Sequence, residues 1–168
     1  MTSYEGSVDI HAAPKTVVGL LHDLSGWTSW TSTIVEATPL GRGVVEPGTR
    51  VRARQPGLPV SVWTVDVVTD HAFEWNNYRH GLRTVARHHI DATPEGSRLQ
   101  VTIQQDGPLA RPVALVLGKV IRHHLQQMMT DIKAAPESAA GTETLDLDRG
   151  RRHAEPEQQL RGSFSENR

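Results

Sequence analysis

The 168-residue sequence contains no cysteine, few aromatic side chains and no long run of apolar residues. The missing cysteines exclude disulfides, thiolate nucleophiles and cysteine-based zinc sites. The longest uncharged apolar stretch, residues 113–118, is far shorter than the roughly 20 residues that span a bilayer. The first ten residues show no signal-peptide pattern. We therefore expect a cytoplasmic protein that does not insert into membranes.

An excess of charge of one sign is also missing. The 18 basic and 19 acidic residues leave a net charge of −1, which lacks the basic footprint of a nucleic-acid-binding protein. The mean hydropathy of −0.42 is typical of a soluble globular protein. The length suits one domain with a core large enough to fold without disulfides or bound metals. No nucleic-acid partner is expected.

The nine histidines do not form a metal-binding motif. His88 and His89 are neighbours on a predicted strand and point to opposite faces. His123 and His124 lie ~100° apart on a predicted helix, which is poor geometry for one ion. The sequence also lacks HExxH, GxSxG, a dinucleotide fingerprint and an evident carboxylate pair. We expect no metal and no cofactor, so any catalysis would be acid–base chemistry.

The first third of the chain predicts a strand followed by two short helices. Alternation over residues 4–10 has the period of a strand with one buried face. Pro14 suits the first turn of a helix, and residues 17–24 carry an apolar stripe at helical spacing. After a Ser-Gly break, Trp27 and Trp30 share one face of a second helical turn.

Residues 34–106 read as consecutive strands joined by short turns, which predicts an antiparallel sheet. Arg50, Arg52 and Arg54 mark the solvated face of one strand. The residues that alternation places on inward faces are Trp63, Val65, Val67, Phe73, Trp75, Asn77, Leu82, Thr84, Ala86, His88, Ile90, Leu99, Val101 and Ile103.

A long helix follows, beginning at Pro108 or Pro112 and running for about 22 residues. Gly118 lies in its middle, where it allows close approach to the sheet or leaves room for a ligand. The residues predicted to form its inward face are Val113, Val116, Val120, His124 and Met128, with Leu117, Ile121 and Ile132 widening it.

This order of elements predicts an α+β fold in which a curved antiparallel sheet wraps around a long C-terminal helix. A curved sheet cannot touch a straight helix along its whole length, so an internal hydrophobic cavity is expected between them. The predicted domain comprises residues 1–135. Residues 136–168 hold few apolar side chains, which predicts a disordered polar tail.

Four stretches in this order resemble the polyketide cyclase/dehydrase-like SRPBCC family of the START-like, helix-grip superfamily. They are SVDIHAAPKTVVGLLHDLSGWTSW, PGTRVRARQPGLPVSVWTV, FEW followed by GLRTVARHHI, and QQDGPLARPVALVLGKVIRHHL. The resemblance covers residues 5–135 and implies a helix-grip fold with a ligand pocket. Members of the family include polyketide cyclases and aromatases as well as lipid and quinone carriers, so the resemblance implies a pocket more than a reaction.

His88 is the candidate catalytic residue, because an imidazole in an apolar cavity can act as a general acid or base. A hydrogen-bonded core histidine is the competing interpretation, and packing competes with ligand contact for the tryptophans. The candidate ligand-binding residues are Trp27, Trp30, Trp63, Phe73, Trp75, Asn77, Thr84, Ala86, Gln105, Val116, Val120 and His124.

The leading functional hypothesis is a protein that binds a hydrophobic small molecule and cyclises or dehydrates a polyketide-type substrate. The alternative is a non-catalytic carrier or sensor of a lipid, quinone or similar apolar ligand. An enzyme should place an acid or base beside the ligand, whereas a carrier should have an almost wholly apolar lining. A protein-interaction module is a third class, and it would need a large exposed apolar patch.

Overall fold

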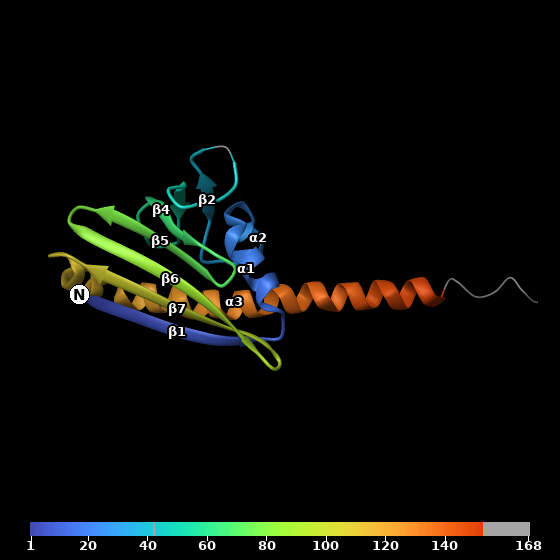
Figure 1. The fold of residues 1–168 in the computed structure, drawn as a ribbon. Coiled ribbons are helices and arrows are strands. Elements are labelled where there is room, and N and C mark those ends of the chain that lie inside the picture. Colours follow the sequence, from blue (N-terminus) through green and yellow to red (C-terminus); the bar gives the residue numbers. More distant parts are fainter. Residues whose placement is uncertain (42, 153–168) are drawn as a thin grey trace, which may run out of the picture. The chain divides into compact units, whose positions relative to one another are not determined.

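The structure, a computed structural model, describes residues 1–41 and 43–152, with side chains as far as Pro136. Figure 1 labels most of its elements along the chain. They are β1 (Thr2–Ile10), α1 (Pro14–His22), the 3₁₀ turn η1 (Leu24–Gly26), α2 (Trp27–Trp30), β2 (Glu36–Pro39), β3 (Arg50–Arg54), β4 (Ser61–Val68), β5 (Ala72–Arg79), β6 (Leu82–Thr93), β7 (Gly96–Asp106) and α3 (Ala110–Arg152).

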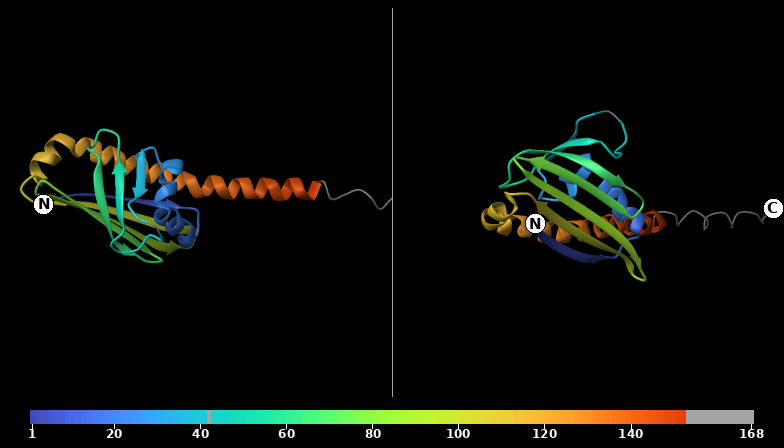
Figure 2. Two further views of the ribbon diagram at one scale, coloured as in Figure 1. Left: turned by 90° about the horizontal axis from the view of Figure 1, so that it is seen from above. Right: turned by 60° about the vertical axis from the view of Figure 1, so that its left-hand side comes forward.

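The seven strands form one antiparallel sheet in the order β1-β7-β6-β5-β4-β3-β2. Strands β2 to β7 follow one another through short connections, whereas β1 pairs with β7 and places Thr2 opposite Gln105. Figure 2 shows the sheet curving, with α1 and the first part of α3 on its concave side. The predicted helix-grip fold is confirmed.

The core lies between this concave face and the helices. Alternation buries one face of each long strand, so Val65, Phe73 and Leu99 are fully enclosed. From the other side, α1 contributes Leu21 and α3 contributes Ile132, both with no exposed surface. These residues belong to one continuous hydrophobic cluster, which fixes the distance between the sheet and α3.

A β-bulge in β4 corrects one predicted strand face. The pairing with β5 shifts between Val65 and Val67, so Val67 lies opposite the outward Glu74 and Val68 lies opposite the buried Phe73. Val68 therefore packs against the core in place of Val67. An extra residue reverses the alternation beyond it, which the sequence pattern alone does not reveal.

Helix α3 is longer than the predicted 22 residues, since it continues to Arg152. The compact unit that contains the sheet extends from Met1 to Glu137, close to the predicted end at residue 135. Residues 136–152, predicted as part of a disordered polar tail, belong to α3. Residues 153–168 lie outside the described part of the chain, and there the disordered tail stays a prediction. No helix in the described part, α3 included, combines the length and apolarity needed to cross a membrane.

Gly118 allows α3 to approach β1 closely. A Cβ at this position would lie 3.1 Å from the hydroxyl oxygen of Tyr4, tighter than most contacts of a real Cβ. Of the two roles predicted for this glycine, close approach to the sheet is the one that the structure supports.

Gly107, which joins β7 to α3, is the position where we expect a small change to be most damaging to the fold. Its φ of +111° strains any L-residue, and an added Cβ would collide with the backbone carbonyl of Gly81. We expect Gly107→Ala to lower the free energy of unfolding by at least about 3 kcal/mol in urea denaturation.

Gly43 provides the matched control, because its φ is +127° but no described residue beyond its chain neighbours lies within 4 Å of the position of a Cβ. Gly43→Ala should cost only the backbone strain, about 1–2 kcal/mol. Equal losses from the two variants would show that the contact between Gly107 and Gly81 contributes nothing.

Candidate functional site

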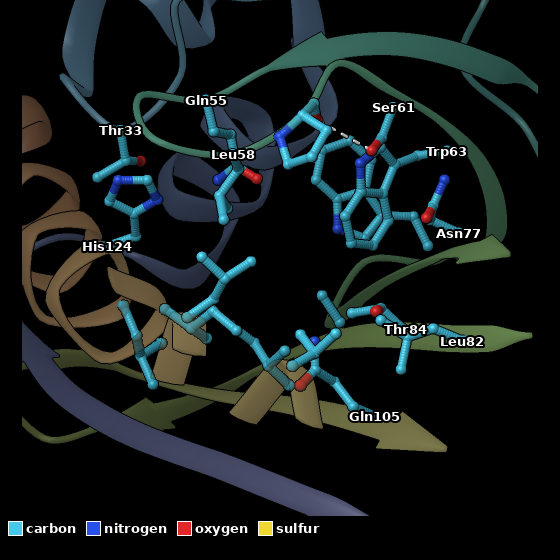
Figure 3. A pocket seen from close by; sticks show the side chains of 18 of the residues that line it. Thr33, Gln55, Leu58, Ser61, Trp63, Asn77, Leu82, Thr84, Gln105 and His124 are labelled. Carbon is cyan, nitrogen blue, oxygen red and sulfur yellow. Dashed lines mark hydrogen bonds between the residues drawn. The ribbon is translucent and has the colours of Figure 1, made fainter. Parts of the chain in front are cut away.

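A cavity lies between the concave face of the sheet and α3, within the unit of residues 1–137. Its volume of about 270 Å³ is slightly below the roughly 300–1,000 Å³ that is typical of small-molecule sites. Side chains from β4 to β7, from the loop between β3 and β4, and from α3 converge on it. In Figure 3, Gln55 and Leu58 of that loop lie across the cavity from Gln105 of β7.

Three tryptophans form one wall of the cavity. Trp63 and Trp75 stack with their ring centroids 4.7 Å apart, and Trp27 meets Trp75 edge-on at 5.0 Å. Trp27 is held in place because its indole nitrogen donates a hydrogen bond to the carbonyl of Leu21 at 3.1 Å. The wall is therefore a rigid aromatic surface that suits contact with a flat apolar ring.

His88 reaches the cavity from the centre of β6. Alternation turns it inward, so only 4% of its surface is exposed, while His89 is exposed and bonds to Asp91. The Nδ1 atom of His88 lies 3.2 Å from the carbonyl oxygen of Phe73 on β5. Burial lowers the pKa of His88 to about 4, so its ring is neutral at pH 7. Since a carbonyl only accepts, Nδ1 carries the proton and Nε2 is left as an acceptor.

Helix α3 closes the opposite side of the cavity. Burial is the main cause that lowers the pKa of His124, and the neighbouring His123 adds to it. The Nδ1 atom of His124 is buried without a hydrogen-bond partner, and Figure 3 shows the ring beside Thr33. The α3 residues that line the cavity are Val113, Leu117, Ile121, His124, Leu125 and Met128, and Leu109 lines it from the turn just before the helix.

The remaining polar lining is uncharged except for one arginine. Asn77 donates from Nδ2 to the carbonyl of Val62 at 2.6 Å, and Ser61 donates from Oγ to the carbonyl of Pro59 at 3.2 Å. Among the described residues that line the cavity, none is an aspartate or glutamate and Arg79 is the only lysine or arginine. Among the side chains that the structure describes, no three from His, Asp or Glu are grouped to hold a metal ion.

Residues 1–137, which include every residue of this cavity, match the model of the family described as polyketide cyclase / dehydrase and lipid transport. The chain belongs to this family. The match confirms the resemblance seen in the sequence and ends where the compact unit ends. The search of curated proteins found no match.

Solved structures share the fold of this family member at low sequence identity. A START superfamily protein from Mycobacterium smegmatis aligns with a TM-score of 0.61 and 15% identity, covering 79% of this chain and 98% of that one. The di-domain ARO/CYC StfQ from the steffimycin biosynthetic pathway aligns with a TM-score of 0.64 and 13% identity, covering 83% of this chain and 51% of that one. Ara h 8.0201 aligns with a TM-score of 0.65 and 12% identity, covering 82% of this chain and 98% of that one. At these identities the likeness establishes the fold alone.

Most of the predicted site residues of this polyketide cyclase/dehydrase family member do meet at the cavity. Their roles in binding or catalysis stay predictions. The predicted residues that line the cavity are Trp27, Trp63, Trp75, Asn77, Thr84, Ala86, His88, Gln105 and His124.

Four predicted ligand contacts do not line the cavity. Val116 is 78% exposed, because α3 is rotated so that the stripe through Val113, Leu117 and Ile121 faces inward. Val120 lies on the edge of this stripe near Gly57. Trp30 and Phe73 pack against Trp27 in the core, at ring distances of 5.8 and 6.0 Å. Packing is therefore the role that the structure gives these two aromatic residues.

Sequence reasoning missed the lining residues that come from irregular segments. Thr33 follows α2, and Gln55, Leu58 and Pro59 form the loop between β3 and β4. The Pro-Gly-Leu-Pro sequence is typical of a turn, but it carries no information about the direction in which the turn points. An apolar Leu58 inside a turn was the one available signal of a buried contact.

Proposed function

We propose that the protein binds an uncharged, apolar, ring-containing small molecule in the cavity between the sheet and α3. The observation that carries this proposal is the wall of Trp27, Trp63 and Trp75 facing a space of about 270 Å³. Burial of an apolar ring against these side chains gains about 25 cal/mol per Å² of area removed from water. Family membership and the START-like fold support the same proposal.

The uncharged fluorophore N-phenyl-1-naphthylamine provides the direct test. We expect saturable one-to-one binding with a rise in its emission, because the probe moves from water to an apolar site. Trp63→Ala should weaken this binding about tenfold, since it removes one of the two stacked rings. The matched control is Tyr78→Ala, which removes an aromatic ring that is 71% exposed and does not line the cavity. Binding that is absent, or equally weakened by both variants, would contradict the proposal.

Cyclisation or dehydration of a polyketide-type substrate is the second candidate function, and the neutral imidazole of His88 in the cavity wall favours it. The pKa of about 4 makes His88 a weak base at neutral pH, which is why we rank ligand binding first. If proton transfer occurs, His88→Gln should lower turnover by about 10²–10⁴-fold while ligand binding is largely kept. Unchanged turnover per folded molecule would exclude His88 as the catalytic base.

A further inference from the structure

A chain of hydrogen bonds fixes the direction of one hydroxyl group at the cavity. Thr31 donates from Oγ1 to Oδ2 of Asp131 at 3.0 Å. Burial alone would raise the pKa of Asp131, but hydrogen bonds from Gln127, Ser32 and Thr31 outweigh it and lower the pKa, so the carboxylate is ionised and only accepts. The single hydroxyl proton of Thr31 is therefore used in the hydrogen bond to Asp131. In the 2.9 Å contact between Thr31 and Thr33, the proton must come from Thr33.

The hydroxyl oxygen of Thr33 therefore offers only lone pairs to a ligand. Three other lining groups each donate one proton to a backbone carbonyl, which cannot donate in return. His88 donates from Nδ1 to Phe73, Asn77 from Nδ2 to Val62, and Ser61 from Oγ to Pro59. Thr33 Oγ1, His88 Nε2 and Ser61 Oγ can therefore only accept from a ligand, whereas Asn77 keeps its second N–H as a donor beside its acceptor Oδ1.

Donors also line the cavity, among them the amide of Gln55 and the hydroxyl of Thr84. The indole nitrogen of Trp75 is buried without a partner and covered by its neighbours, so a ligand cannot reach it without displacing them. Gln105 accepts from Thr2 at its Oε1 atom, which leaves its amide N–H groups as donors. Arg79 is exposed and already donates to the carbonyl of Val60. The lining thus offers both donors and acceptors, and within it Thr33 Oγ1 and His88 Nε2 are limited to accepting.

From this arrangement we infer that the cavity selects neutral ring compounds that carry hydroxyl groups, which donate to Thr33 Oγ1 and His88 Nε2. The inference rests on the proposed function and names the ligand class. A hydroxyl group both donates to these acceptors and accepts from Gln105, whereas an ether only accepts. A carboxylate neither donates nor finds a cation beside Thr33 or His88, so its burial is costly. Asp131 acts on the ligand only through Thr31 and Thr33 and is a positioning residue.

Isothermal titration calorimetry at pH 7 with three compounds of one ring system tests the inference. We expect 2,6-dihydroxynaphthalene to bind at least about tenfold more tightly than 2,6-dimethoxynaphthalene, because an unsatisfied buried acceptor is costly. The anion 2-naphthoate should bind more weakly than either. Thr33→Val keeps the shape of the side chain and removes the acceptor, so it should reduce the preference about threefold or more without weakening the dimethoxy compound.

Two further variants separate the effect of the direction of the Thr33 hydroxyl proton from the effect of side-chain packing. Asp131→Ala should also reduce the hydroxyl preference, since Thr31 then regains a free proton that it can donate to Thr33. Thr38→Val, the same change at an exposed threonine, should leave all three affinities unchanged. If the dimethoxy compound binds as tightly as the dihydroxy compound, the inference is overturned while cavity binding stands. If none of these compounds and no N-phenyl-1-naphthylamine binds, the proposed function itself fails.

Discussion

Replacing Ala86 with tryptophan is expected to abolish binding of apolar ligands. Ala86 lies in the middle of β6, is 6% exposed and lines the cavity between its cross-strand neighbours Trp75 and Ile103. An indole at this position would point into the space that a ligand needs. We expect the affinity for N-phenyl-1-naphthylamine to fall at least about 100-fold, which corresponds to about 3 kcal/mol.

The new side chain should fill existing space, so the loss of stability should stay within the about 1–3 kcal/mol that overpacking costs. Val116→Trp is the control, because it adds the same indole on the exposed face of α3. Probe binding at wild-type affinity by folded Ala86→Trp would place the ligand somewhere other than this cavity.

The second large effect concerns acid. In the unfolded chain the imidazole of His88 takes up a proton near pH 6.5, whereas burial lowers its folded pKa to about 4. Between these two values the unfolded state binds more protons, so the free energy of unfolding falls as the pH drops through this window. The loss from His88 alone should reach about 3 kcal/mol by pH 4 and be absent above pH 7.

Urea denaturation at pH 7 and pH 4 of the wild type and of His88→Gln measures this contribution. The variant should lose about 3 kcal/mol less than the wild type between the two pH values, whatever its stability at pH 7. His22 and His124, whose pKa values burial also lowers, titrate in both proteins and cancel in this comparison. An unchanged response in His88→Gln would show that His88 is not held neutral.

The sequence predicts the regular elements and their faces well, because backbone period couples directly to burial. Alternation along β6 separates the buried His88 from the exposed His89. The same reasoning assigns Arg50, Arg52 and Arg54 to solvent, and all three are exposed. Pro14 begins the first helix as expected. Each of these features depends on neighbours within a few residues.

What sequence reasoning misses depends on contacts between distant residues. The rotation of α3 that exposes Val116 is set by packing against the sheet, and several rotations suit its apolar stripe. The bulge between Val65 and Val67 leaves no local signature. Thr31 and Asp131 lie 100 residues apart, so the bond that orients Thr33 is invisible until the fold is known. The polar character of the cavity is therefore a tertiary property.

The pairing of β1 with β7 sets the point at which this domain becomes able to fold during synthesis. The first strand finds its partner about 100 residues later, with Thr2 opposite Gln105. Until β7 has left the ribosome, β1 has no strand to pair with and β6 lacks one of its two neighbouring strands. Both strands then have exposed edges with unpaired backbone groups, and such edges favour association between chains. Contacts of such long sequence separation also slow folding, since loop closure costs entropy before the pairing repays it. The nascent chain thus depends on its last strand to protect its first.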